Sequence, residues 1–246
     1  MLDNGSVKCW GWNEMGQLGI DNTTNMGDNQ GEMALLPVVN LGTGRTATAI
    51  AAGSAFTCAI LDNASVKCWG RNNYGQLGID NTTNMGDDSG EMALLPVVNL
   101  GTGRTATAIA AGNQHTCAIL DNSSIKCWGS NASGQLGLGH TNNRGDGSNV
   151  MGNLPSVDLG SGRTAKVIAA GDSHTCAILD NASVKCWGEN GNGQLGQGGI
   201  DDLGDESGEM GDSLTAINLG SGRTATSITT GTGYTCVLLD DDSVKC

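Results

Sequence analysis

The sequence predicts an all-β fold of the β-propeller type, built of four-stranded blades, and three observations support this. A repeat of 59 residues occupies almost the whole chain of 246 residues. Each repeat holds several short apolar runs separated by turns that are rich in glycine, and the chain has 40 glycines. No repeat contains an amphipathic segment of helical length. Short strands at a fixed spacing, each bounded by turn residues, are typical of propeller blades.

The repeats define the expected organisation of a single propeller domain over residues 1–246. The first three follow one another without gaps, and the fourth has one inserted residue and lacks the final Trp. They are residues 11–69, 70–128, 129–187 and 188–246. Residues 1–10 match only the end of a repeat. Because the sequence starts and stops within a repeat, it predicts a partial ring or part of a longer array, or chains that associate end to end through open edges.

Each repeat contains one predicted β-hairpin, and the copy at residues 57–70 is representative. Its two apolar runs flank a polar corner at residues 62–64. A three-residue corner places Cys58 opposite Cys68, close enough for a disulfide. The same spacing pairs the cysteines as Cys58/Cys68, Cys117/Cys127, Cys176/Cys186 and Cys236/Cys246, and it leaves Cys9 unpaired. The alternative is reduced cysteine packed as a small apolar residue.

The remainder of the repeat is predicted from its turn residues and apolar runs. In the second copy, Gly75–Gly78 is followed by a polar loop at 79–93. A strand is expected at Leu94–Leu100, with Pro near its start, where a missing N–H is tolerated. After a turn at 101–105, the small residues of Ala106–Ala111 predict an inner strand beside a crowded central channel.

Three segments of this repeat resemble a known family. They are Trp69–Gly78, Pro96–Val98 and Ile109–Ile119. Together they are similar to the repeat of the regulator of chromosome condensation family, in which each repeat contributes a four-stranded blade, usually to a seven-bladed propeller. The resemblance implies a propeller that binds proteins across one face. The cysteine pairs and an acidic insert such as Met85–Met92 depart from the nuclear members and resemble disulfide-bearing members of secreted bacterial and algal proteins.

Charge and cysteine content restrict the partners and the compartment. The net charge is −13 and the pI is about 4.3, which argues against nucleic acid or an anionic membrane surface as a partner. No apolar run approaches the roughly 20 residues of a membrane-spanning helix, so direct membrane insertion is not expected. Paired cysteines predict an oxidising location: extracellular, cell-surface or lumenal.

The acidic inserts are the candidate metal site. Carboxylates, Asn side chains and backbone carbonyls in one loop suit a hard cation such as Ca²⁺, although the spacing is not that of an EF-hand. The alternative is a solvated acidic loop. The candidate ligands are Asp21, Asp28, Glu32, Asp80, Asp87, Glu91, Asp146, Asp201, Asp205 and Glu209.

No catalytic or cofactor-binding residue is predicted, and the chain is not expected to be an enzyme. Gly101–Thr105 lacks the Lys-Ser/Thr ending of a phosphate-binding loop and is predicted as a β-turn, in which Arg104 pairs with a nearby acid or carbonyl. His115 and His174 occupy a position held by an aromatic residue in the other copies, which indicates packing. The repeated Trp residues, such as Trp69, are expected to pack between blades.

The leading functional hypothesis is therefore a non-enzymatic extracellular binding or scaffold module on a disulfide-stapled propeller, with a protein partner or self-association. The alternative is a self-assembling surface or filament protein with calcium-binding acidic loops. Two further hypotheses follow only from the resemblance: a guanine-nucleotide exchange factor for a small GTPase, and an enzyme inhibitor.

Overall fold

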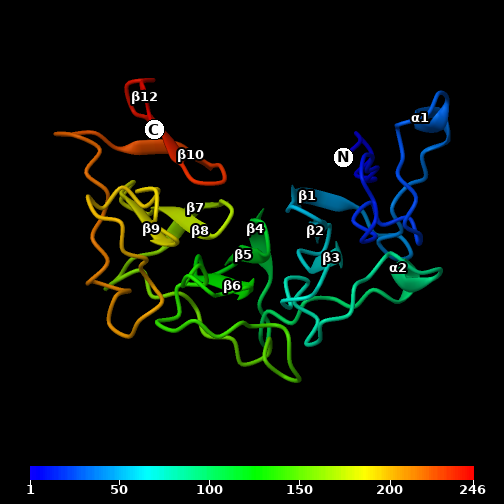
Figure 1. Cartoon of the computed structure of the whole chain (residues 1–246), viewed down its shortest axis with the longest axis horizontal. Helices are drawn as coiled ribbons and strands as arrows, with labels where there is room; N and C mark the ends of the chain where they lie inside the picture. Colours follow the sequence, from blue (N-terminus) through cyan, green and yellow to red (C-terminus); the bar gives the residue numbers. More distant parts are fainter.

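The computed structural model describes all residues, 1–246, and contains four antiparallel three-stranded sheets arranged along an open arc (Figure 1). The sheets are β1 (Ala47–Ala52), β2 (Phe56–Leu61) and β3 (Val66–Gly70); β4 (Ala106–Ala111), β5 (His115–Leu120) and β6 (Ile125–Gly129); β7 (Ala165–Ala170), β8 (His174–Leu179) and β9 (Val184–Gly188); and β10 (Ala225–Thr230), β11 (Thr235–Leu239) and β12 (Val244–Lys245).

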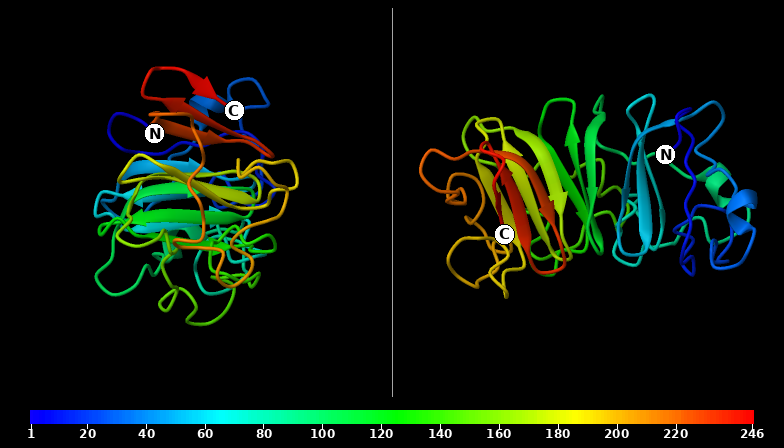
Figure 2. Two further views of the ribbon diagram at one scale, coloured as in Figure 1. Left: turned by 90° about the vertical axis from the view of Figure 1, so that its left-hand side faces the viewer. Right: turned by 90° about the horizontal axis from the view of Figure 1, so that it is seen from above.

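The sheets lie side by side as the blades of a propeller. Their first strands, β1, β4, β7 and β10, adjoin one another in that order and line the inside of the arc. Figure 2 shows the blades stacked in sequence order, with the two termini at opposite ends. The predicted propeller is confirmed, and the ring is open between the first and the last blade (Figure 1).

The hairpin register agrees with the sequence prediction. Ile60 pairs with Val66, and Cys58 pairs with Cys68. The corner has three residues and closes with the N–H of Ala64 donating to Leu61 O (2.9 Å). Ala64 has a φ of 60°, the left-handed conformation that three-residue hairpin loops need at this position. All four predicted disulfides are present, with Cα–Cα distances of 4.0–4.1 Å, and Cys9 is free.

The predicted fourth strand of each blade is wrong. The segment at Leu94–Leu100 lies along β3 but makes one hydrogen bond to it, from Val98 N to Val66 O (2.9 Å). Pro96 has no N–H, so the next bond of a ladder cannot form, and Leu94 itself ends a helical turn. The other blades repeat this single bond, from Val39 N to Val7 O, Val157 N to Ile125 O and Ile217 N to Val184 O.

Two one-turn helices, α1 (Glu32–Leu35) and α2 (Glu91–Leu94), were not predicted. They lie at the end of the acidic insert in the first two repeats. In the third repeat Val150 replaces the glutamate that begins the turn, and in the fourth Gly211 has a φ of 71°, so neither repeat forms the helix. With four residues each, neither helix is long enough to cross a membrane.

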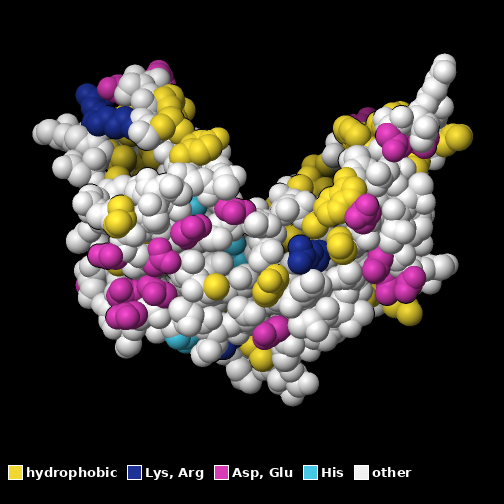
Figure 3. All heavy atoms as spheres, in the orientation of Figure 1, with side chains coloured by type: hydrophobic (Ala, Val, Ile, Leu, Met, Phe, Trp, Pro, Cys, Tyr) yellow, Lys and Arg dark blue, Asp and Glu magenta, His cyan; other side chains and the backbone are white.

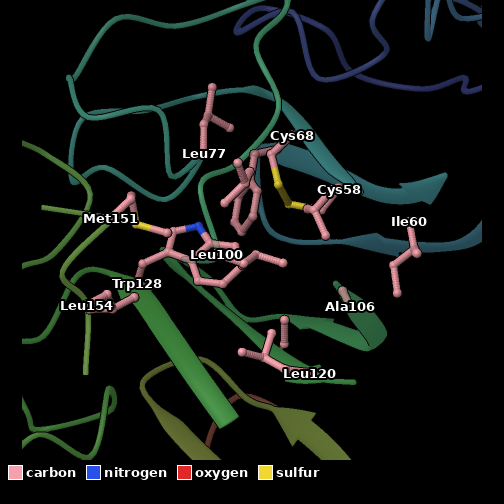
Figure 4. Close-up of a cluster of buried hydrophobic side chains, with 14 residues drawn as sticks. Cys58, Ile60, Cys68, Leu77, Leu100, Ala106, Leu120, Trp128, Met151 and Leu154 are labelled. Atoms are coloured by element: carbon pink, nitrogen blue, oxygen red, sulfur yellow. A yellow bond between two sulfur atoms is a disulfide. The ribbon is translucent and has the colours of Figure 1, made fainter. Parts of the chain in front are cut away.

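The hydrophobic core is divided into clusters that lie between neighbouring blades. In one such cluster the Cys58–Cys68 disulfide of the first blade packs with Leu120 and Trp128 of the second blade (Figure 4). Trp128 is fully buried, as are Trp69 and Trp187 at the same position in their repeats. The predicted packing of these indoles between blades is therefore confirmed, and the disulfides of the first three blades are part of interblade contacts.

Candidate functional site

The inner strands of all four blades end at one rim of the central channel. Each strand is followed by a glycine and a two-residue loop, and the loop closes when the glycine N–H donates to the carbonyl three residues later, as from Gly112 to His115 (2.9 Å). We call these eight loop residues the inner rim: Ser54, Ala55, Asn113, Gln114, Asp172, Ser173, Thr232 and Gly233. The first residue of each loop, together with the glycines and the strand ends, borders a hollow of about 350 Å³.

The glycine before each rim loop places neighbouring blades in close contact. A Cβ atom on Gly112 would lie 2.3 Å from Cε1 of His115 and 2.5 Å from the carbonyl oxygen of Gly171 in the next blade. Gly53 and Gly171 meet the next blade in the same way. Because the obstacle includes backbone of another blade, a side chain here forces the blades apart. The rim loops are thus attached to closely packed blades, and this packing limits how far the blades can move relative to one another.

Gly112→Ala is expected to lower the free energy of unfolding by about 1–3 kcal/mol, because the added methyl overpacks the blade interface. Urea denaturation followed by tryptophan fluorescence measures this. Gly191→Ala is the matched control, since a Cβ there meets no atom within 4 Å. Equal unfolding midpoints for the two variants would contradict the close contact of the blades.

The predicted packing histidines lie directly beneath the rim. The Nε2 atom of His115 is 2.9 Å from Oγ1 of Thr175 in the next blade, and Nε2 of His174 is 3.0 Å from Oγ1 of Thr235. Both rings are buried, and this desolvation lowers the pKa of His115 to about 3 and that of His174 to about 4. At neutral pH both rings are uncharged, and they bridge blades.

The acidic inserts are held mainly by their own backbone. Glu91 accepts hydrogen bonds from the N–H groups of Gly86 (2.7 Å) and Asp88 (3.1 Å), and Glu209 accepts the equivalent pair. In the first repeat, hydrogen bonds from Asn29 and from the N–H of Gly27 lower the pKa of Glu32 to about 2. These glutamates therefore organise the loop that precedes them.

Two of the aspartates connect successive repeats. Asp21 accepts the N–H of Met92, and Asp80 accepts the N–H of Met151, both at 2.8 Å. Each has a positive φ, and in the third and fourth repeats Gly139 takes this place with a φ of 69° and Gly198 with a φ of 80°. The candidate ligand Asp201 lies three residues after Gly198 in the fourth loop and so does not take the place of Asp21 and Asp80.

The remaining candidate ligands are spread over separate loops. Asp28 accepts a hydrogen bond from its neighbour Asn29. Three further candidates lie with their backbone in close contact with a glycine of the preceding repeat. They are Asp87 beside Gly16, Asp146 beside Gly75 and Asp205 beside Gly134. No three His, Cys, Asp or Glu side chains lie together as a metal-binding group. Acidic side chains are scattered over the face shown in Figure 3, and calcium binding stays a prediction without an assembled ligand set.

Two family models, both described as the regulator of chromosome condensation (RCC1) repeat, match this chain. One matches residues 4–60, 65–119 and 127–178, and the other matches 47–76, 106–135 and 166–194. The chain belongs to the RCC1 repeat family.

Curated relatives share this repeat at moderate identity. The ultraviolet-B receptor UVR8 of Arabidopsis thaliana is 29% identical over 198 residues, which is 80% of this chain and 40% of the receptor. The probable E3 ubiquitin-protein ligase HERC4 of Homo sapiens is 32% identical over 149 residues, which is 60% of this chain and 13% of the ligase. The chain thus spans less than half the length of these relatives.

Solved structures confirm the fold at low sequence identity. Prp20p from Saccharomyces cerevisiae superposes with a TM-score of 0.71 at 20% identity, covering 98% of this chain and 52% of Prp20p. Human WBSCR16 has a TM-score of 0.71 at 18% identity, covering 97% of this chain and 54% of that protein. The four blades described above correspond to about half of each RCC1-type structure.

The turn at Gly101–Thr105 of this RCC1 repeat carries a structural ion pair. Arg104 lies 3.1 Å from a carboxylate oxygen of Asp121, with both side chains about two-fifths exposed. Such exposed pairs contribute little to stability, so this one mainly fixes the turn against the hairpin corner. The predictions of a β-turn and of an acidic partner for the arginine are confirmed, and the other three repeats have the same pair.

One repeated residue that organises the polar loop was missed by the sequence analysis. Asn72 is fully buried and accepts the N–H of Leu77 (3.0 Å), and its amide donates to the carbonyls of Asn81 (2.8 Å) and Thr83 (3.0 Å). The signal was present, because every RCC1 repeat has Asn at this position, as Asn13, Asn72, Asn131 and Asn190. An invariant amide in an otherwise variable polar loop indicates buried hydrogen bonding.

Proposed function

We propose that this chain is a non-enzymatic binding module that holds a protein partner on the inner rim. One observation carries the proposal. The strands and hairpins that carry the rim are largely shared by the repeats, yet the two rim residues differ in every repeat: Ser-Ala, Asn-Gln, Asp-Ser and Thr-Gly. The glycine before them and the Thr-Cys pair that follows one residue later do not change. The rim residues are exposed or half-buried, apart from Ala55, which is buried.

Rim residues that differ between otherwise similar blades support the recognition of one specific surface on a partner protein. Loops on a rigid scaffold commonly carry binding residues, because the scaffold already holds the loops in place and less conformational entropy is lost on binding. Here the rim offers a hydroxyl, an amide and a carboxylate from three different blades within one hollow. A shallow polar surface of this kind suits a folded protein better than a small apolar ligand.

The comparisons support a protein partner. The solved structure of Prp20p was described with binding properties to Gsp1p and histones, and yeast RCC1 was solved bound to Kap60. These partners are properties of those proteins, whose chains are about twice as long as this one. For this chain we propose only the class, a protein bound on a propeller face.

We further propose that the module works in an oxidising compartment, outside the cell or in a lumen. Four disulfides in one chain support this, because reducing compartments keep such thiols free. The acidic surface, with a net charge of −13, favours a partner with basic character.

The experiment compares two triple variants as affinity baits. In the rim variant, Ser54→Lys, Asn113→Lys and Thr232→Lys add three charged side chains to the inner rim. In the matched control, Thr43→Lys, Thr102→Lys and Ser221→Lys add the same charge to exposed turns at the opposite end of the inner strands. Each bait captures proteins from the culture medium of the source cells, quantified by mass spectrometry against the native chain.

The proposal predicts that the native chain and the turn control enrich the same protein, and that the rim variant loses it by about tenfold or more, the effect of losing a central contact. Equal capture by the rim variant and the turn control would place the partner elsewhere. Capture of no protein by the native chain would contradict the binding function.

A further inference from the structure

Three of the hairpin corners carry the acceptor motif for N-linked glycosylation. The motif is Asn-x-Ser/Thr, in which x is any residue other than proline, and in secreted proteins an oligosaccharide is attached to its Asn side chain. The first corner reads Asn-Ala-Ser, the second Asn-Ser-Ser and the third Asn-Ala-Ser, and the acceptors are Asn63, Asn122 and Asn181. Turns are rich in Asn and Ser, so the surroundings of each Asn decide whether the folded chain can hold a glycan.

At these corners the acceptor nitrogen is free. Asn63 is exposed, and its Oδ1 accepts the N–H (3.2 Å) and the hydroxyl (2.7 Å) of Ser65. Asn122 and Asn181 are also exposed and make the same two bonds to the serine two residues later. This Asx turn holds the amide oxygen against the backbone and leaves the amide nitrogen facing solvent. Nδ2 makes no hydrogen bond at any of the three corners, so a glycan attached there displaces no contact.

The same motif occurs at Asn131, where the fold excludes a glycan. Asn131 begins the sequence Asn-Ala-Ser, but it is fully buried. Its Nδ2 donates to the carbonyl oxygens of His140 and Asn142, and its Oδ1 accepts the N–H of Leu136. Both amide hydrogens are in use, so a glycan on this nitrogen would break the bonds that hold the polar loop. The chain therefore contains an internal control with the same motif as the first corner.

Three further exposed motifs lie outside the three corners and begin at Asn4, Asn22 and Asn81. Asn4 belongs to the partial repeat at residues 1–10. In the polar loops, Nδ2 of Asn22 donates to the carbonyl oxygen of Ile20 (3.1 Å), and Nδ2 of Asn81 donates to the carbonyl two residues before it (3.2 Å). A glycan at either loop site has to share the nitrogen with this bond. The three hairpin corners are therefore the acceptors that the fold favours.

The three corners project from one face of the propeller. In the second blade, Asp121 joins the corner to the turn before the inner strand, because it accepts hydrogen bonds from Nη1 of Arg104 (3.1 Å) and the N–H of Thr105 (3.3 Å). The inner rim lies at the other end of β5, which has six residues and is therefore about 20 Å long. Neighbouring blades are stacked in the same direction, so the three acceptor asparagines lie on the face opposite the inner rim (Figure 2). We call the face that carries these three asparagines the corner face.

We propose that Asn63, Asn122 and Asn181 each carry an N-linked glycan. This rests on the oxidising compartment proposed above, because the oligosaccharide is added in the lumen of the secretory pathway. There Nδ2 attacks the anomeric carbon of a lipid-linked oligosaccharyl diphosphate. The N–C bond forms, and the C–O bond to the diphosphate breaks, with its electron pair leaving on the diphosphate. One amide proton passes to a base of the transferase.

Glycans on the corner face determine which face of the propeller a partner can reach. Each glycan is bulky and hydrated, so three of them on neighbouring blades exclude another protein from that face. The inner rim has no acceptor motif, because its one asparagine, Asn113, is followed by Gln114 and His115. The glycans therefore leave the inner rim as the open face, where the partner is proposed to bind.

The corner of the fourth blade indicates how the acceptor can be removed without changing the turn. Oδ1 of Asp241 accepts the N–H (3.2 Å) and the hydroxyl (2.6 Å) of the serine two residues later, as the asparagines do. A carboxylate has no amide nitrogen and cannot be glycosylated. Asn63→Asp/Asn122→Asp/Asn181→Asp is therefore expected to fold and to lose all three glycans. Asp241→Asn/Asp242→Ala restores the Asn-Ala-Ser motif of the first corner and is expected to gain one glycan.

The test maps the glycosylation sites of the protein isolated from its natural source. Glycopeptides are measured by mass spectrometry before and after enzymatic release of the glycans. The expected result is a glycan on each of the three corners in most molecules and none on Asn131. Bare corners, or a glycan on Asn131 as often as on a corner, would overturn the proposal.

Capture from the culture medium separates this proposal from the proposed function. The triple aspartate variant, secreted from the source cells, is expected to lose three glycans and to capture the same partner as the native chain. A variant that remains as glycosylated as the native chain, or one that loses the partner, would overturn the proposal. Bare corners on a native chain that captures its partner would overturn the glycans and leave partner binding standing. Glycosylated corners without capture would contradict partner binding alone.

Discussion

Replacing both Cys117 and Cys127 by alanine is expected to lower the free energy of unfolding by roughly 3 kcal/mol. The two residues are 10 apart in sequence, so their bond closes a loop of about eleven residues. The closed loop lowers the conformational entropy of the unfolded chain. Both sulfurs are also fully buried in the contact between the second and third blades. The variant therefore loses a cross-link and interblade packing together. Urea denaturation, read from the midpoint and slope, measures the loss.

Cys9→Ala is the control for this variant, because Cys9 has no disulfide partner. Its free energy of unfolding is expected to fall by less than about 1 kcal/mol. A reducing agent should lower the midpoint of the native chain and of Cys9→Ala alike. If Cys117→Ala/Cys127→Ala unfolds at the same urea concentration as the native chain, the stabilising role of the hairpin disulfide is contradicted.

Lowering the pH from 7 to 5 is expected to destabilise the protein through its two buried histidines. Their folded pKa values, about 3 for His115 and about 4 for His174, lie below the usual value of 6.5. Below pH 6.5 the unfolded chain binds protons that the folded chain excludes. Stability from these rings is therefore fully present above pH 6.5 and falls as the pH drops toward 4. At pH 5 the loss from His115 alone is about 2 kcal/mol, and His174 adds to it.

The chain itself provides the control for this acid sensitivity. Phe56 occupies the same position in the first blade, so His115→Phe/His174→Phe is expected to fold with rings that cannot be protonated. Unfolding midpoints at pH 7 and pH 5 should differ less in this variant than in the native chain. An unchanged difference would assign the acid sensitivity to carboxylates and not to the histidines.

The hairpins could be predicted from sequence because they depend on local chemistry. The corner at Asp62–Ala64 sets the loop length, and the loop length sets the register that brings Cys58 to Cys68. The 59-residue period and the resemblance to RCC1 repeats then predicted that these hairpins belong to the blades of a propeller. Fold, disulfides and buried tryptophans followed from these signals.

The outer strand and the acidic inserts were harder to predict, because their structure depends on partners distant in sequence. Leu94–Leu100 has the apolar residues of a strand, but Pro96 and a single anchoring bond leave it irregular. Asp80 was expected to face solvent or a cation, yet it accepts the N–H of Met151, which is 71 residues away. The inner rim was not predicted, because its loops meet only when four blades surround one channel.

The most direct test of this account is non-reducing peptide mapping of the protein isolated from its natural source with all free thiols blocked at lysis. The account predicts three within-hairpin linkages, Cys58–Cys68, Cys117–Cys127 and Cys176–Cys186, with none of these six sulfurs blocked. Recovery of these cysteines as blocked thiols would contradict both the stapled blades and the oxidising compartment.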